Sequence, residues 1–269
     1  MPDIKFDDLL QCVVIQARID TPSISMGSPT PRARGGRPVV IDAFTASHEI
    51  DMVRYRLELH APIAARTVIA ESNYTFTGAA KPLYMKLHLT HDEIRRYNIR
   101  LLFIQIPPQT LKRVRACSEG HYVENGTRRS CGHNEAFAIE RLSRSVMNKA
   151  LLEEIVALND TLTQERVSGR DEHAANTANT AAPPSELFVY FSDVDELLDP
   201  VALRNNTARV PGCTGVRQRV FLYNENCFQR NVRWIRALIA RGAWLAPVLR
   251  KYPEIELRMV HAGGKDLIK

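Results

Sequence analysis

The feature that most constrains this chain is the alternation of short, β-branched apolar runs with longer segments of helical periodicity. Strands are predicted at residues 38–44, 66–70, 99–106 and 187–191, and helices at residues 47–59, 90–97 and 134–158. Pro107 and Pro108 end the third strand because proline has no amide hydrogen to donate to a sheet. This alternation predicts an α/β fold with a central, mostly parallel sheet covered by helices on both faces.

The chain of 269 residues suits one domain of this class. Residues 1–37, rich in Pro, Ser, Gly and Arg towards their end, are predicted to be an N-terminal arm or extra element, and residues 38–269 the domain itself. Residues 160–185 turn polar and end in two prolines, so we expect a flexible insertion whose removal is tolerated. Thr45 or Ser47 is expected to cap the first helix.

The net charge of +6 and the isoelectric point near 9.2 permit binding to many anions. The basic residues are spread along the chain without interleaved aromatics, so nucleic acid is not an expected partner. No stretch approaches the roughly 20 apolar residues that cross a bilayer. The sequence also shows no export signal, and we expect neither a transmembrane segment nor secretion.

The five cysteines stand at irregular spacing and specify no disulfide framework, so a reducing compartment is the simpler expectation. Thiolate and imidazole are preferred zinc ligands, and four such residues lie close together in the sequence: Cys117, His121, Cys131 and His133. Their spacing fits no usual zinc knuckle, and a basic surface loop is the favoured interpretation.

Asp193 and Asp195 directly follow the apolar run 187–191. In open α/β sheets, ligands bind at the carboxyl ends of strands, and two neighbouring carboxylates there can address one hard cation and the phosphates it bridges. The plain alternative is that Asp193 caps a turn or the helix after Pro200. A second alternative is an aspartyl-phosphate phosphatase, but in that class the motif opens the domain, whereas here it lies near the end.

Further motifs occur in one order along the chain: Ile41–Arg56 (IDAFTASHEIDMVRYR), Ala70–Gly78 (AESNYTFTG), Lys81–Leu83 (KPL) and Asp193–Glu196 (DVDE). Together they resemble the β-1,4-mannosyl-glycoprotein 4-β-N-acetylglucosaminyltransferase family, glycosyltransferase family 17, which includes the enzyme that adds bisecting N-acetylglucosamine to N-glycans. The resemblance runs from about Val39 to the C-terminus, with residues 160–185 outside it.

The resemblance implies a single-domain GT-A type nucleotide-diphospho-sugar transferase fold. It also implies inverting transfer from UDP-N-acetylglucosamine to a sugar hydroxyl of a glycan acceptor, with Mn²⁺ or Mg²⁺ as the cofactor. Asp193 and Asp195 match the metal and diphosphate motif, which Glu196 completes. The eukaryotic relatives work in the Golgi, but without an anchor we expect this chain in the cytoplasm or the cytosol of a host cell.

Other positions match the family's upstream blocks. Glu49, Asp51 and Arg56 match its first charged helix, where Glu49 is a candidate donor-binding residue and an ion pair between Glu49 and Arg56 is the structural alternative. Glu71 is a candidate catalytic residue that would hold a sugar hydroxyl or the uridine ring, and Lys81 could pair with a phosphate. Phe76 is either part of the same block's function or a core aromatic.

Towards the C-terminus, Glu140 and Arg144 resemble the family's Glu-x-x-x-Arg-Asn, with Ser145 where Asn is expected. Arg144 is a candidate catalytic residue, and a surface ion pair is the alternative. His261 resembles a histidine of the family that would add a metal ligand. For residues 229–242 the apolar period indicates a helix, whereas the family comparison indicates a strand near Trp234.

The general base stays open among Glu225, Asp199 and Glu135. Two other functions stay open as well: transfer of another UDP-sugar or to another acceptor, and a catalytically weak sugar-nucleotide-binding protein of the same fold.

Overall fold

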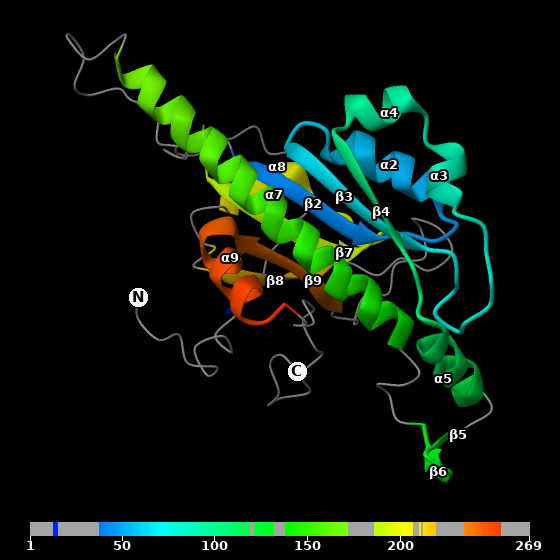
Figure 1. Ribbon diagram of the computed structural model, residues 1–269. Coiled ribbons are helices and arrows are strands. Elements are labelled where there is room, and N and C mark those ends of the chain that lie inside the picture. The colour runs from blue at the N-terminus through cyan, green and yellow to red at the C-terminus, as the bar shows by residue number, and fades with distance from the viewer. Residues whose placement is uncertain are drawn as a thin grey trace.

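The computed structural model describes residues 13–15, 38–118, 121–131, 138–171, 186–206, 210, 212–218 and 234–253. Within them, seven strands form one sheet of order β1-β8-β9-β7-β2-β3-β4 (Figure 1). Four strands make its parallel half: β7 (Leu187–Asp193), β2 (Val39–Thr45), β3 (Ala64–Ser72) and β4 (Ile99–Ile104). The sheet is therefore mixed but mostly parallel, and the predicted α/β class is confirmed.

In the other half of the sheet, one of the described strands runs in the direction opposite to all the others. β9 (Trp234–Arg241) runs antiparallel to both of its neighbours, β7 and β8 (Cys213–Gln218). β1 (Val13–Ile15) pairs in parallel with the outer side of β8. β9 also decides the open question about residues 229–242, because residues 234–241 form a strand and Gly242 begins the next helix, while residues 229–233 lie outside the described part of the chain. A central strand is buried on both faces and carries apolar side chains on both, so its sequence does not show the apolar and polar alternation that identifies a strand with one exposed face.

Helices cover both faces of the sheet (Figure 1). α7 (Ala138–Asp171) and α9 (Gly242–Lys251) pack on one face, against alternate residues such as Ile41 and Ala43. On the other face, α2 (Ile50–His60) and α3 (Tyr84–His88) pack against Phe44. α8 (Pro200–Asn206) packs there against Val40 and its neighbours. Successive side chains of a strand point to opposite faces, so each residue's position decides which helix layer it contacts.

The helices α4 (His91–Arg96) and α2 begin in different ways. α4 begins with a capping box, in which Thr90 Oγ1 accepts a hydrogen bond from the Glu93 amide at 3.1 Å and Glu93 Oε2 accepts one from the Thr90 amide at 2.8 Å. The capping prediction for the first helix was wrong, because Thr45 still belongs to β2 and Glu49 takes the N-cap position without a side-chain cap bond.

The long helix α7 corrects the predicted insertion. It continues to Asp171, so residues 160–171 are helical, and residues 172–185 lie outside the described part of the chain. Leu158 and Leu162 lie one turn apart and both pack against the core, so the apolar stripe of the helix extends beyond the point where the composition turns polar. Polar residues at this end of α7 therefore belong to a helix and not to a loop.

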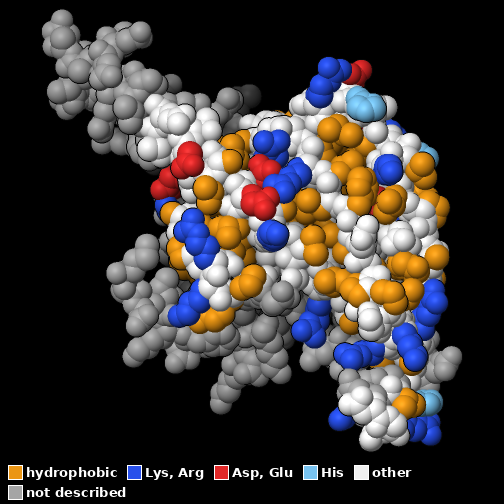
Figure 2. All heavy atoms as spheres, in the orientation of Figure 1, with side chains coloured by type: hydrophobic (Ala, Val, Ile, Leu, Met, Phe, Trp, Pro, Cys, Tyr) orange, Lys and Arg blue, Asp and Glu red, His pale blue; other side chains and the backbone are white. Residues whose placement is uncertain are grey.

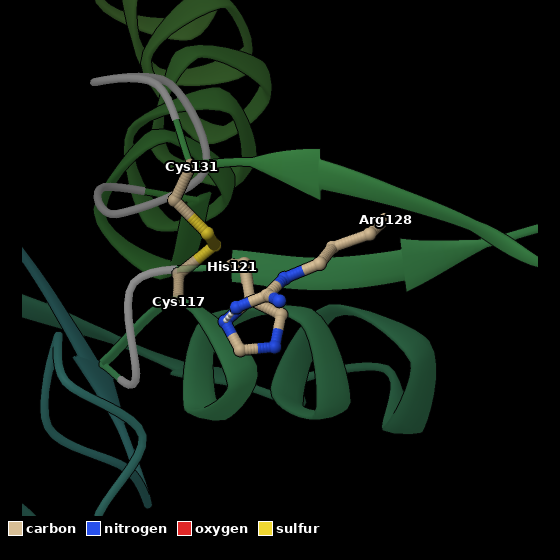
Figure 3. The surroundings of a disulfide bond; sticks show 4 residues. All are labelled: Cys117, His121, Arg128 and Cys131. Atoms are coloured by element: carbon tan, nitrogen blue, oxygen red, sulfur yellow. Dashed lines mark hydrogen bonds between the residues drawn. A yellow bond between two sulfur atoms is a disulfide. The ribbon is translucent and has the colours of Figure 1, made fainter.

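A small hairpin stands apart from the main sheet (Figure 1). β5 (His121–Glu124) and β6 (Thr127–Ser130) pair around Asn125-Gly126, both with positive φ, as a tight two-residue hairpin turn requires. A disulfide between Cys117, near the end of α5 (Pro108–Ser118), and Cys131 closes its base (Figure 3). The expectation of reduced cysteines was thus wrong for this pair, and neither thiolate is left to bind zinc. His133 lies outside the described residues.

The hairpin end of the molecule is basic. Lys and Arg side chains gather over α5, β5 and β6 (Figure 2), and Lys112, Arg113, Arg128 and Arg129 are exposed. In the described part of the chain, no helix combines the length and the apolar character that a membrane span requires.

Candidate active site

The carboxyl edge of the parallel strands brings the predicted motifs together. In the register of the sheet, Thr45 at the end of β2 pairs with Asp193 at the end of β7, and β3 ends beside them at Ser72. The chain then turns at once: the Glu196 amide donates to the Asp193 carbonyl at 3.1 Å, and the Asp193 amide donates to Glu196 Oε2 at 3.0 Å. Glu196 is buried. Its carboxylate therefore braces the turn that presents Asp193 and Asp195.

Asp193 points towards the α7 side of the sheet, because it alternates with Ser192 and shares its face with Phe191. There Arg144 Nη2 donates to Asp193 Oδ1 at 2.7 Å, and Arg144 Nε donates to Glu140 Oε1 at 3.0 Å. The Arg144 side chain is only 5% exposed, whereas that of Asp193 is 37% exposed. The alternative of a surface ion pair is corrected in one respect: Glu140 and Arg144 do pair, but the pair is buried because this part of α7 lies against the sheet.

Asp195 lies two residues beyond and is exposed. The pKa of its carboxyl is raised, first because surrounding protein displaces water from it and then because the negative charges of Asp193 and Glu49 act on it. Negative charge therefore accumulates at this edge. Such a place favours a bound cation, because a cation offsets the mutual repulsion of the carboxylates.

The fit to a divalent cation can be tested on these residues. Within the described residues, no three His, Cys, Asp or Glu side chains converge to form a complete metal site. Asp193 and Asp195 supply two carboxylates at an edge open to solvent. Mg²⁺ is commonly held by one or two carboxylates together with water and substrate phosphates, so this pair fits a site that a nucleotide completes.

Behind the turn lies a buried polar cluster centred on Arg56 of α2. Its side chain is fully buried and donates to both Asp42 oxygens, at 2.6 and 3.0 Å, and to Ser192 Oγ at 2.8 Å. Arg56 also donates to three main-chain carbonyls of the turn, those of Asp193, Val194 and Glu196, at 2.6 to 3.3 Å. One side chain thus determines the path of the backbone that carries both aspartates.

Asp42 and His60 complete this cluster. His60 Nδ1 lies 2.7 Å from Asp42 Oδ2, and His60 Nε2 lies 3.1 Å from the Leu198 carbonyl beyond the turn. Burial by itself raises the pKa of Asp42, but Arg56 and His60, through their charges and hydrogen bonds, hold that pKa well below its ordinary value. Sequence reasoning missed both residues. The available signal was an aspartate in the middle of the apolar run PVVIDAF.

Glu49 does not pair with Arg56 as the structural alternative supposed, because Arg56 turns inwards to Asp42. Glu49 Oε2 instead accepts the amides of Ser47 and His48, at 2.8 and 3.0 Å, and shapes the loop between β2 and α2. Its charge contributes to the raised pKa of Asp195. A role for Glu49 in donor binding stays a prediction.

Glu71 and Lys81 close a second loop at the same edge. Glu71 is buried and accepts from Lys81 Nζ at 2.9 Å and from the amides of Tyr84 and Met85, at 2.7 and 2.9 Å. These contacts make Glu71 an anchor of the loop and of α3. The predicted catalytic role of Glu71 and the phosphate-binding role of Lys81 stay predictions.

The remaining predicted residues divide into described and undescribed ones. Phe76 is 42% exposed and is not a core aromatic. Asp199 Oδ1 accepts the Val201 amide at 2.8 Å and caps the start of α8. Ser145 is partly buried beside Arg144. His261, Glu225 and Glu135 lie outside the described residues.

Comparison with known families identifies the family to which the chain belongs. The sequence model of glycosyltransferase family 17 matches residues 30–177, more than half of the chain. The chain belongs to glycosyltransferase family 17. It is therefore a glycosyltransferase, and the phosphatase alternative is set aside. No curated protein matches the chain.

The family 17 match covers strands β2 to β4 and all of α7, and with them Asp42, Arg56, Glu71 and Arg144. It ends before Asp193, so the place of Asp193 and Asp195 in this glycosyltransferase rests on the fold. In the fold, Arg56 and Arg144 belong to the matched segment and both contact Asp193, so they connect Asp193 to that segment.

Proposed function

We propose that this glycosyltransferase transfers N-acetylglucosamine from UDP-N-acetylglucosamine to a sugar hydroxyl of a glycan, with inversion at the anomeric carbon. Asp193 and Asp195 would hold Mn²⁺ or Mg²⁺, and through it the donor diphosphate. The observation that carries the proposal is the placement of two carboxylates at the carboxyl edge of a parallel sheet.

The residues of this edge have separate tasks in the proposed reaction. Asp195 and Asp193 orient the diphosphate, while Arg56 and Glu196 keep their backbone rigid, which favours catalysis by holding reacting groups in place. When bound, a divalent cation offsets the charge that develops on the departing UDP. An inverting transfer also needs a base on the opposite side of the sugar, and we assign that role to none of the described residues.

The test is release of UDP from UDP-N-acetylglucosamine in the presence of Mn²⁺ and a panel of glycan acceptors. We expect Asp195→Asn to lower turnover by about 100-fold or more, because it removes a charge that acts on the transition state while it preserves shape. Asp92→Asn is the matched control, because Asp92 is an exposed aspartate paired with Arg95 on α4.

The outcomes separate the possibilities. Turnover with a different UDP-sugar, again lost in Asp195→Asn, would move the proposal to that donor. Metal-dependent binding of UDP-sugars without turnover on any acceptor would favour the weak sugar-nucleotide-binding protein. Equal turnover in the wild type and Asp195→Asn would reject the assigned metal site.

A further inference from the structure

Arg144 is shared between two carboxylates that differ in exposure. Its Nε is bonded to Glu140 Oε1 at 3.0 Å, and its Nη2 to Asp193 Oδ1 at 2.7 Å. The Glu140 side chain is 11% exposed and that of Asp193 is 37% exposed. The Phe191 ring lies beneath the guanidinium, 5.3 Å from Cζ to the ring centroid. Arg144 is therefore anchored on its buried side and reaches the open edge on the other.

The bond to Asp193 conflicts with the proposed use of that aspartate. A guanidinium on Asp193 Oδ1 already supplies the positive charge that the carboxylate needs. A divalent cation on the same carboxylate would lie a few ångströms from the guanidinium, where like charges repel strongly in a partly desolvated site. The cation must therefore compete with Arg144 for Asp193.

A donor diphosphate resolves the conflict. It brings negative oxygens to the same edge, and planar guanidinium groups bind phosphate oxygens well through paired hydrogen bonds. Glu140 Oε1 lies 3.0 Å from both Nε and Nη2 and would keep the guanidinium in place while Nη2 exchanges the Asp193 oxygen for a phosphate oxygen.

We propose that Arg144 is an exchange residue of the donor site: it neutralises Asp193 until the donor arrives, and then transfers to the diphosphate as the cation takes Asp193. This inference rests on the proposed function. It adds that the cation and the nucleotide bind cooperatively, because each removes the obstacle to the other.

The experiment measures two affinities in Arg144→Gln by calorimetry: that of Mn²⁺ alone, and that of UDP at saturating Mn²⁺. We expect Mn²⁺ alone to bind about tenfold more tightly than in the wild type, because its competitor is gone. We expect UDP to bind about tenfold more weakly, because a charge-assisted contact is lost. A purely structural residue would weaken both.

Two further variants serve as controls for the effect of Arg144→Gln on the two affinities. Arg141→Gln removes an exposed arginine from the same turn of α7, and both affinities should stay at the wild-type value. Glu140→Gln combined with Arg144→Gln avoids a buried, unpaired carboxylate, and should shift both affinities as Arg144→Gln does even if the single variant folds poorly.

Asp195→Asn distinguishes this inference from the function it rests on. If Asp195→Asn abolishes Mn²⁺ binding but the double variant binds Mn²⁺ no more tightly than the wild type, the exchange role of Arg144 is wrong and the metal site stands. If the wild type binds no Mn²⁺ with or without UDP, both proposals fall.

Discussion

At the scale of single residues, the cluster of Asp42, Arg56 and His60 places charged and polar side chains in the core of the molecule. Arg56 and Asp42 are both essentially inaccessible to solvent and form a two-pronged ion pair. Burying such a pair gains little by itself, but breaking it leaves an uncompensated charge in the core. The structural role of the pair follows from its geometry, because Arg56 holds three carbonyls of the turn that carries Asp193 and Asp195.

We therefore expect Asp42→Asn to lower the free energy of unfolding by about 3–5 kcal/mol, measured by urea denaturation at pH 7. Asp92→Asn, which breaks an exposed pair with Arg95, should lower it by less than about 1 kcal/mol. An equal cost for the two substitutions would contradict the structural role of the cluster.

The effect of Asp42→Asn on the free energy of unfolding should depend on pH. The pKa of Asp42 is lower in the folded chain than its ordinary value of 3.8, so its contribution to stability is complete above that value and is lost as the pH falls towards the folded pKa. The stability difference between wild type and Asp42→Asn should thus narrow below about pH 4. A difference that stays constant down to the acid limit of folding would count against the lowered pKa.

At the scale of elements, the hairpin β5–β6 depends on its disulfide. An isolated two-stranded hairpin is marginally stable in water, and every residue of β6 is exposed. The Cys117–Cys131 bond restricts the unfolded alternatives of this segment. Disulfides form and persist in oxidising environments, so formation of this bond requires such conditions, and the compartment expected from the sequence stays a prediction.

We expect the double substitution Cys117→Ser and Cys131→Ser to abolish hydrogen-exchange protection in residues 121–130. Protection in β2 and β7 should stay at the wild-type level, because those strands lie in the separate main sheet. Hydrogen exchange with mass spectrometry measures both in one experiment. Undiminished protection of the hairpin would show that its cross-strand contacts suffice.

At the scale of the whole molecule, donor binding should stabilise the fold, because a ligand that binds only the folded chain shifts the unfolding equilibrium. A 100-fold excess of ligand over its dissociation constant contributes roughly 2.7 kcal/mol, which corresponds to a rise of about 5 °C or more in Tm for a chain of this size. We expect this rise with Mn²⁺ and UDP together in differential scanning fluorimetry. Asp195→Asn should show little of it, and an equal rise in that variant would place the ligand elsewhere.

The sequence by itself determined the layers of this glycosyltransferase. Alternating apolar runs and helical periods are local signals, and they predicted β2, β3, β4, β7 and the core of α7 correctly. They failed where local composition misleads: residues 160–171 are mostly polar and so were predicted to be a loop, yet they are helical and Leu162 continues the apolar stripe. Asp193 and Asp195 could be singled out because a carboxylate pair after a buried strand is visible in one short segment, and their role in metal binding stays a prediction.

Only the tertiary structure decided which partners the charged residues find. Arg56 and the Asp193 carbonyl are 137 positions apart in sequence, and Arg144 and Asp193 are 49 apart. Glu140, four residues from Arg144, gave an equally good local explanation for that arginine. The side-chain alternation of β7 turns Asp193 towards α7 and Ser192 towards α2, and so assigns each arginine its place. Contacts of this kind depend on how strands and helices pack, and that packing is a property of the whole chain.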